Sequence, residues 1–248
     1  MLNYKMNRFT ASATHLGISL VIFLVLGYLI LYHWYPNIFF ATDGGWQGIR
    51  IIAFVDLVLG PTLTLAVFKA GKPGLKMDLT LIGTLQAVCL IAGTYVVYSE
   101  RPVAMVFADG IFHSVTVDDF MQETGSIPDL SLFSGPYPKW VSVTLPEDPA
   151  EQSSVRTEAR KNGIPVRMLT NHYQSFKQTD IDYKRDAFPL SDIQAGDKKN
   201  GELRRFLAKY GGTAQDYTFI AFGTRYKRVL LGMRSGNGIS EILELPTP

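Results

Sequence analysis

LGISLVIFLVLGYLILYHWY, residues 16–35, is the stretch that decides the fold of this chain. It contains no Asp, Glu, Lys or Arg, and a helix of 20 residues is about 30 Å long, the thickness of the hydrocarbon core of a bilayer. Residues 51–68 form a second apolar run with one charge, and residues 79–99 form a third run with none. Three runs of this length predict three membrane-spanning helices rather than the buried helices of a soluble core.

The composition of the whole chain agrees with a membrane protein. Of its 248 residues, 47% are hydrophobic and 19% are charged, whereas an ordinary soluble domain carries about 25% charged residues. The 24 Lys and Arg residues nearly balance the 22 Asp and Glu residues, which excludes a strongly basic nucleic-acid-binding protein. The single cysteine, Cys89, excludes an internal disulfide framework and a multi-cysteine metal site.

The short charged segments beside the apolar runs predict the orientation in the membrane. We interpret the first run as a retained anchor, because its apolar part exceeds the roughly 15 residues of a signal-peptide core and no small-residue cleavage site follows it. Positive charges lie before the first run and between the second and third, at Lys5, Arg8, Lys69, Lys72 and Lys76. The positive-inside rule places these segments in the cytoplasm. We therefore expect the C-terminal domain on the opposite side of the membrane, which in a Gram-negative cell is the periplasm.

Two domains are expected: a transmembrane domain at residues 1–100 and a soluble domain at residues 101–248. The soluble domain holds 18 basic and 18 acidic residues, so it has no charge signature for nucleic acid or anionic lipid. Apolar runs at 103–107 and 112–117, separated by Asp109-Gly110, predict a β-hairpin. Further strands are predicted at 140–145, 217–224, 227–233 and 239–245, with a 235–238 turn, and helices at 148–162 and 202–210. The expected fold class is thus three transmembrane helices followed by an α+β domain with an antiparallel sheet.

Motifs that would indicate catalysis are missing from the sequence. The four histidines lie far apart with no HExxH spacing, and neither GxSxG nor SxxK occurs. Asp180-x-Asp182 could suggest the metal site of a glycosyltransferase, but two acids in a polar loop are common without such a role. We therefore predict no catalytic residues, no cofactor-binding residues and no metal site.

Asp56 lies inside the second apolar run, where a charged side chain is costly and therefore suggests a function. Gly60 and Thr64 follow at four-residue steps, so the three residues share one helix face. An acid, a small residue and a hydroxyl on one face suit the packing of another helix. The alternative is that Asp56 lies near the membrane surface and pairs with Arg50.

A second, weaker signal of helix packing lies on the third run. Gly83 and Ala87 form a pair of small residues one helical turn apart, which lets another helix approach closely in lipid. The predicted helix-docking residues are therefore Asp56, Gly60, Thr64, Gly83 and Ala87.

Three stretches carry a resemblance to a known family. HLGISLVIFLVLGYLILYHWYP at 15–36, DGGWQGIRIIAFVDLVLGPTLTLAVFKAGKPGLKMDL at 43–79 and RPVAMVFADG at 101–110 closely resemble the type IV pilin accessory proteins of Gram-negative bacteria. The resemblance implies an inner-membrane protein that is encoded beside the major pilin and influences how much pilin is made and assembled. It implies no catalytic residues.

Together, the patterns and the resemblance favour a non-enzymatic accessory protein or chaperone for the type IV major pilin. Its membrane helices would bind the pilin helix and its soluble domain the pilin head, so that two weak contacts combine. Two alternatives stay open. A membrane-tethered enzyme that modifies the pilin, for example by glycan transfer, should show acidic or histidine clusters in its soluble loops. A sensor whose soluble domain binds a small ligand should carry a cytoplasmic output domain.

Overall fold

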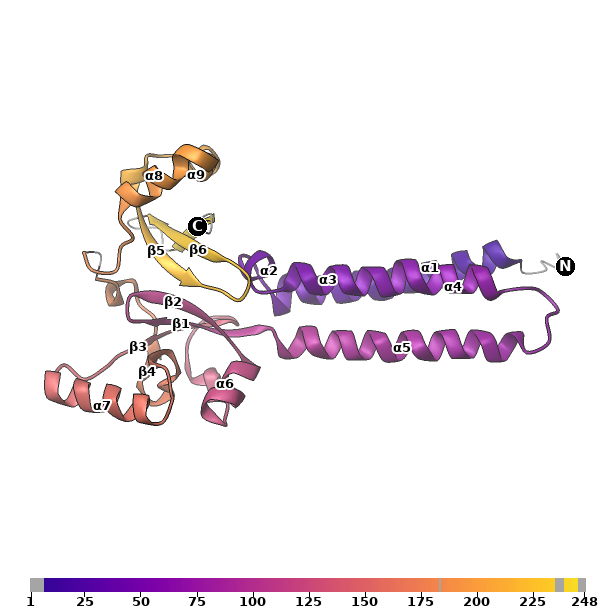
Figure 1. Cartoon of the computed structure of the whole chain (residues 1–248), viewed down its shortest axis with the longest axis horizontal. Coiled ribbons are helices and arrows are strands. Elements are labelled where there is room, and N and C mark those ends of the chain that lie inside the picture. Colours follow the sequence, from indigo (N-terminus) through magenta and orange to yellow (C-terminus); the bar gives the residue numbers. More distant parts are fainter. Residues whose placement is uncertain (1–6, 183, 235–238, 245–248) are drawn as a thin grey trace. The chain divides into compact units, whose positions relative to one another are not determined.

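The computed structural model describes residues 7–182, 184–234 and 239–244 of the chain. The chain divides into two compact units, Met1–Arg101 and Pro102–Pro248. Figure 1 shows that the first unit is built of long helices and that the second contains a sheet with helices beside it. Each unit is described separately below.

Three helices of the first unit are long and apolar enough to cross a membrane: Arg8–Trp34, Gly45–Val67 and Leu75–Ser99. The first consists of α1 (Arg8–Leu29) and the π-helical turn η1 (Ile30–Trp34). The second consists of α3 (Gly45–Ala53), the π-helical η2 (Phe54–Leu59) and α4 (Gly60–Val67), and follows the short helix α2 (Phe39–Thr42). The third is α5 (Leu75–Ser99). The three predicted apolar runs are thus confirmed as helices.

The helices begin earlier than the predicted bounds of 16–35, 51–68 and 79–99 and end within one residue of them. The first begins at Arg8, because the Asn7 side chain accepts a hydrogen bond from the Thr10 backbone N–H at 2.9 Å and caps the helix. The second and third begin directly after Gly44 and Gly74, whose φ angles of 108° and 79° break the preceding chain direction. Apolar runs mark the part of a helix that suits lipid, whereas caps and glycines mark where the helix begins.

The second unit holds one mixed sheet. Its strands are β1 (Pro102–Ala108), β2 (Ile111–Thr116), β3 (Lys139–Val143), β4 (Tyr173–Ser175), β5 (Tyr217–Gly223), β6 (Arg228–Arg234) and β7 (Ile239–Glu244). They lie in the order β4-β3-β1-β2-β5-β6-β7. The predicted hairpin is present as β1 and β2, and its turn residues Asp109 and Gly110 have φ angles of 51° and 78°, which suit Asp and Gly.

The prediction of an antiparallel sheet was wrong in part. β1 pairs in parallel with β3, and β2 pairs in parallel with β5, whereas β5, β6 and β7 are antiparallel as expected. Each parallel pair needs a crossover that returns the chain to the same end of the sheet. An apolar run has the same pattern whichever way its neighbour runs, so the strand pattern does not reveal these crossovers. The predicted 235–238 turn and residue 245 lie outside the described residues.

Helices accompany the sheet, and the predicted helices at 148–162 and 202–210 are present. The α-helices are α6 (Val117–Thr124), α7 (Pro149–Lys161), α8 (Leu190–Asn200) and α9 (Glu202–Tyr210). Short 3-10 helices are η3 (Leu130–Leu132), η4 (Val166–Met168), η5 (Thr170–His172), η6 (Gln178–Asp180) and η7 (Ala214–Asp216). Residues 168–200 have weak hydrophobic periodicity, so no element is predicted there, and the structure places β4 and α8 in this region.

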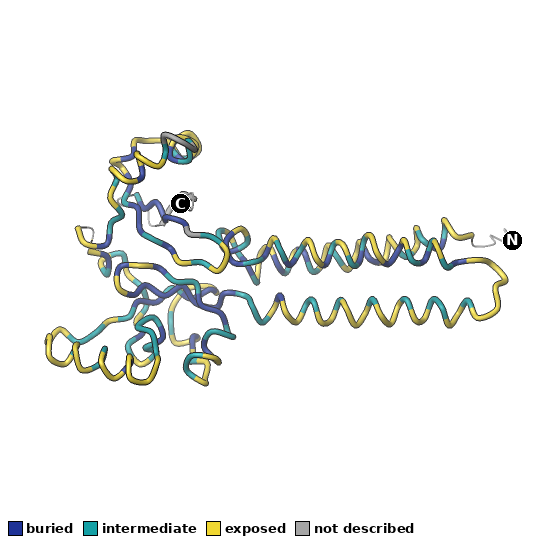
Figure 2. Tube along the Cα trace, in the orientation of Figure 1, coloured by how far each residue is buried: buried dark blue, intermediate teal, exposed yellow. Residues whose placement is uncertain are grey.

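Among the described residues, two apolar clusters form part of the core of the second unit. One gathers around β1, β2 and α6 and includes Val106, Val115, Phe120, Met168 and Tyr173. The other joins α8 and α9 to β5 and β6 and includes Ile193, Leu203, Phe206, Phe219 and Leu230. Figure 2 shows this burial along the strands, whereas the long helix α5 is mostly exposed or half-buried along its length.

Candidate functional site

Asp56 lies at the centre of a polar contact among the three membrane helices. Its side chain is almost fully buried, at 1% exposure. The Nε2 of Gln86 on α5 donates to Asp56 Oδ1 at 3.0 Å and to the Oγ of Ser19 on α1 at 3.3 Å. One amide therefore links all three helices. The second carboxyl oxygen of Asp56 and the amide oxygen of Gln86 are buried without a hydrogen-bond partner among the described residues.

Gly60 makes room for this contact. A Cβ atom placed on Gly60 would lie 2.2 Å from Gln86 Oε1 and 2.5 Å from its Nε2, closer than real Cβ contacts come. Pro61 follows, and because its ring removes an N–H and clashes with the carbonyl four residues earlier, the preceding turn widens into η2, where Asp56 lies. The local sequence thus places Asp56 and opens the path for Gln86.

The remaining polar groups on this face are paired with α1. The Oγ1 of Thr64 lies 2.6 Å from Nδ1 of His15, and Ser12 Oγ donates to the carbonyl of Pro61 at 2.9 Å. Asp56, Gly60 and Thr64 therefore share a face, and α1 and α5 of the same chain cover it. In this arrangement the face holds the bundle together, and its role toward a partner helix stays a prediction.

The alternative pairing of Asp56 with Arg50 is not present in the structure. The guanidinium of Arg50 lies 5.8 Å from the centre of the Trp46 ring instead. Sequence reasoning missed Gln86 as the actual partner of Asp56. A signal was present, because Gln86 is the single amide in the uncharged run 79–99, and an amide in lipid needs a partner.

Gly83 and Ala87 lie elsewhere, on an exposed face of α5. Both residues are exposed, and a Cβ atom on Gly83 would meet nothing within 4 Å. Along α5, Val97 is the one residue that counts as buried. The five predicted docking residues therefore form two separate sets, one inside the bundle and one facing outward.

An apolar groove lies between α1 and α5 and is here called the α1–α5 groove. Its volume is about 590 Å³, and its lining residues are Val21, Ile22, Val25, Leu26, Trp34, Leu90, Ile91, Thr94, Tyr95 and Tyr98. At 100° per residue, Gly83 and Ala87 fall on the same face of α5 as Leu90, Thr94 and Tyr98. They lie on that face N-terminal to the groove-lining residues of α5, and they have little or no side chain.

The C-terminal end of α5 is fixed against the first two helices, so the groove has a defined wall there. Tyr35 Oη donates to the carbonyl of Val97 at 2.8 Å, and the rings of Trp34 and Tyr98 meet edge to face at 5.2 Å. Gly48 on α3 faces Val97, where a Cβ atom would lie only 2.7 Å from a Val97 methyl.

The Asp180-x-Asp182 pair lies in the second unit. Asp180 Oδ2 accepts from Ser142 Oγ at 2.7 Å, and Asp182 Oδ1 accepts from the backbone N–H of Lys184 at 3.1 Å. Across the part of the chain that the structure describes, no group of three or more His, Cys, Asp or Glu side chains is arranged to hold a metal ion.

Comparison with known proteins finds relatives among the fimbrial assembly proteins of Dichelobacter nodosus. The serogroup C1 and C2 protein is 34% identical over 99 residues, which are 39% of this chain and 75% of that relative. The chain belongs to this family. The serogroup E1 protein is 35% identical and the serogroup I protein 34% identical over 99 residues, and in both cases the match spans 38% of the relative. No family model and no solved structure matches.

These relatives confirm the part of the prediction that assigns the chain to a fimbria-related family. Because the chain matches little more than a third of the length of two of these relatives, the activity of the whole protein is a matter of proposal.

Proposed function

We propose that this protein acts in fimbrial biogenesis as a non-enzymatic membrane accessory protein, or chaperone, for the type IV pilin subunit. The α1–α5 groove is the observation that carries the proposal. The names of the related fimbrial assembly proteins support the same process.

The groove suits a single apolar helix. A pilin before assembly is held in the membrane by such a helix, with a globular head outside it. Gly83 and Ala87 allow a partner backbone to come close, which favours helix association in lipid, where no hydrophobic force drives it. Thr94, Tyr95 and Tyr98 supply hydroxyls to the largely apolar lining. The groove thus offers an apolar surface with a few polar groups, and the small residues beside it allow close packing.

The proposed location is the bacterial inner membrane, with the N-terminus in the cytoplasm and the second unit in the periplasm. Arg8, Lys69 and Lys72 between α4 and α5, and Lys76 in the first turn of α5 support this orientation. The second unit would then lie on the same side of the membrane as the pilin head and could contact it. Two modest contacts to one pilin raise the overall affinity, because binding of the first places the second at high effective concentration.

Site-specific photocrosslinking in living cells tests the groove. A photoreactive amino acid at Ala87 should crosslink to the pilin, whereas the same amino acid at Leu85 should crosslink much less. Leu85 is a sound control because it is 55% exposed on the same helix but lies about 160° around it from Ala87.

Matched glycine substitutions give a second readout. Gly83→Leu should lower the crosslink at Ala87, because a large side chain blocks close approach. Gly93→Leu should leave it unchanged, since Gly93 also has nothing within 4 Å of its Cβ position but lies on another face of α5. Equal crosslinking from Ala87 and Leu85, or equal effects of the two leucine variants, would refute docking in the groove.

The enzyme alternative is separated from this proposal by the mass of the pilin. An accessory protein should change the amount of pilin, or of surface fimbriae, and leave the pilin mass unchanged when its gene is deleted. Intact-protein mass spectrometry of pilin from wild-type and deletion strains measures this directly. A mass difference that the restored gene removes would favour the modifying enzyme.

A further inference from the structure

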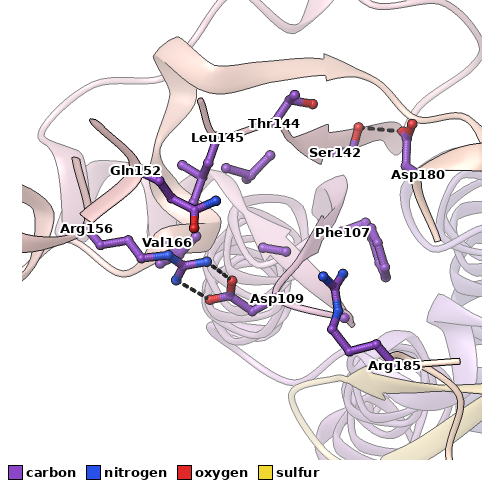
Figure 3. Close-up of a pocket in the computed structure, with 13 residues that line it drawn as sticks. Phe107, Asp109, Ser142, Thr144, Leu145, Gln152, Arg156, Val166, Asp180 and Arg185 are labelled. Carbon is purple, nitrogen blue, oxygen red and sulfur yellow. Dashed lines mark hydrogen bonds and ion pairs between the residues drawn. The ribbon is translucent and has the colours of Figure 1, made fainter. Parts of the chain in front are cut away.

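A cleft of about 480 Å³ lies in the second unit at the carboxyl ends of the parallel strands β1 and β3, beside α7. Figure 3 shows it opening around Asp109, which follows β1, with Ser142 and Thr144 near the end of β3. Open sheets bind ligands outside the carboxyl ends of their parallel strands, and cavities of about 300–1,000 Å³ hold small molecules. The position and size of the cleft therefore fit a small-ligand site.

Two arginines line the cleft, and a carboxylate fixes the orientation of each. Arg156 on α7 donates from its two Nη atoms to Asp109 at 2.5 and 3.1 Å (Figure 3). Arg185 donates from Nε and Nη2 to Asp186 at 2.7 and 3.2 Å, and the Asp186 side chain is 1% exposed. Each guanidinium has five N–H groups, so each keeps several for a ligand while its plane is held in place.

The cleft also offers hydrogen-bond acceptors. Asp180 Oδ2 accepts hydrogen bonds from Ser142 Oγ at 2.7 Å and from the Lys177 backbone N–H at 2.8 Å. Its other carboxyl oxygen, Oδ1, can therefore accept a hydrogen bond from a ligand. The amide of Gln152 lines the cleft and can both donate and accept. The lining thus combines donors and acceptors in similar number.

The charge balance argues against an anionic ligand. The two arginines are matched by Asp109, Asp186 and Asp180, so a phosphate or carboxylate would meet no net positive charge. Apolar surface completes the lining, contributed by Phe107, Ala108, Val143, Leu145 and Val166.

We propose that this cleft binds an uncharged saccharide of one or two rings. Sugar hydroxyls both donate and accept hydrogen bonds, which suits Arg185, Gln152 and Asp180, and the C–H face of a sugar ring suits the apolar lining. The site is independent of the α1–α5 groove, so either proposal can fail without the other.

Binding is measured on the full chain in lauryldimethylamine oxide micelles, because detergents with sugar headgroups would occupy the site. Glucose, N-acetylglucosamine and maltose are titrated by isothermal titration calorimetry, with sodium sulfate and triglycine in parallel. We expect saturable binding of at least one saccharide with a Kd of about 1 mM, and no saturable binding of sulfate or triglycine.

Variants assign the binding to the cleft. Arg185→Gln should weaken saccharide binding roughly tenfold or more, and Gln152→Leu roughly two- to tenfold, because each removes hydrogen bonds to the ligand. Arg160→Gln is the control, since Arg160 is one turn further along α7 and lies outside the cleft lining. Absence of saturable saccharide binding, binding that Arg185→Gln and Gln152→Leu leave unchanged, or binding of sulfate or triglycine in place of the saccharides would overturn the proposal.

Discussion

At the scale of single residues, the contact between Asp56 and Gln86 joins α5 to the second membrane helix. The two residues are 30 positions apart in the chain and meet at 3.0 Å. Asp56 could be singled out from the sequence, because a carboxyl group in an apolar run is conspicuous. Gln86 also stands out, as the one amide in the run 79–99. That the two residues pair could not be predicted, because several helix faces were compatible with the pattern and the packing around Gly60 selects the face that carries Gln86.

A double-mutant cycle measures this contact. Gln86→Leu should destabilise the helix bundle, because it leaves the buried Asp56 carboxyl without its partner, whereas Asp56→Leu should be tolerated better and leave membrane insertion intact. The effect of the double variant should differ from the sum of the single effects by about 0.6–2 kcal/mol. Unfolding of the purified chain in mixed micelles with increasing SDS gives these free energies, with Leu85→Ala as an exposed control. Simple additivity of the two changes would contradict a direct contact.

His113 on β2 predicts a dependence of stability on pH in the second unit. Burial lowers its pKa from 6.5 to about 4, with a further contribution from Arg167, while Asp109 acts in the opposite direction. Below pH 6.5 the unfolded chain therefore binds a proton that the folded chain does not. The free energy of unfolding should fall as the pH drops from 6.5 to 4, by on the order of 2–3 kcal/mol at most.

The comparison with His113→Gln isolates this contribution from that of the carboxylates. Urea unfolding of the second unit, followed by tryptophan fluorescence at several pH values, should show a shallower slope between pH 6.5 and 4 in the variant. Parallel slopes for the two proteins would show that His113 is protonated equally in the folded and unfolded chains.

At the scale of secondary structure, the sequence predicts elements better than it predicts their partners. Runs without charge at 16–35 and 79–99 are sufficient to place two membrane helices, and Asp109-Gly110 is sufficient to place the β1–β2 hairpin. The parallel pairing of β1 with β3 depends on the crossover through α6, which leaves no trace in either strand. The α1–α5 groove could not be predicted from the sequence either, because it arises where two helices do not pack closely. An apolar helix face has the same residue pattern whether it faces lipid or lines a groove.

The β1–β2 hairpin provides a test of packing at its turn. Gly110→Ala should destabilise the second unit more than Gly135→Ala does, although both glycines have positive φ angles, of 78° and 87°. The backbone strain is shared, at about 1–2 kcal/mol for a non-glycine residue. A Cβ atom at Gly110 would in addition lie 2.6 Å from Asp186 Oδ1, whereas Gly135 has nothing within 4 Å. Thermal unfolding of the two variants compares them directly, and equal losses would show that Asp186 moves aside freely.

At the scale of the whole molecule, each of the two units carries one of the two proposed binding sites. The membrane unit offers the α1–α5 groove to a helix, and the second unit carries the cleft beside α7. The division into a membrane part and a soluble part follows from charge-free runs in the first hundred residues. The assignment of each part to a side of the membrane rests on lysines, and it is open to a direct measurement.

Reporter fusions test that orientation. Lys69, Lys72 and Lys76 lie in or beside the loop before α5, and Lys72 pairs with Asp78 at 2.6 Å, so much of the loop charge is carried by the other two lysines. Positively charged loops are retained in the cytoplasm during insertion. Alkaline phosphatase, which is active only in the periplasm, should therefore be inactive when fused at Gly74 and active when fused after Pro248. Replacing the three lysines with glutamine should weaken this contrast, because the charge bias that holds the loop inside is removed, whereas three lysine-to-arginine changes should preserve it. The reverse pattern, activity at Gly74 and none after Pro248, would place the second unit in the cytoplasm, where it could not meet the periplasmic head of a pilin.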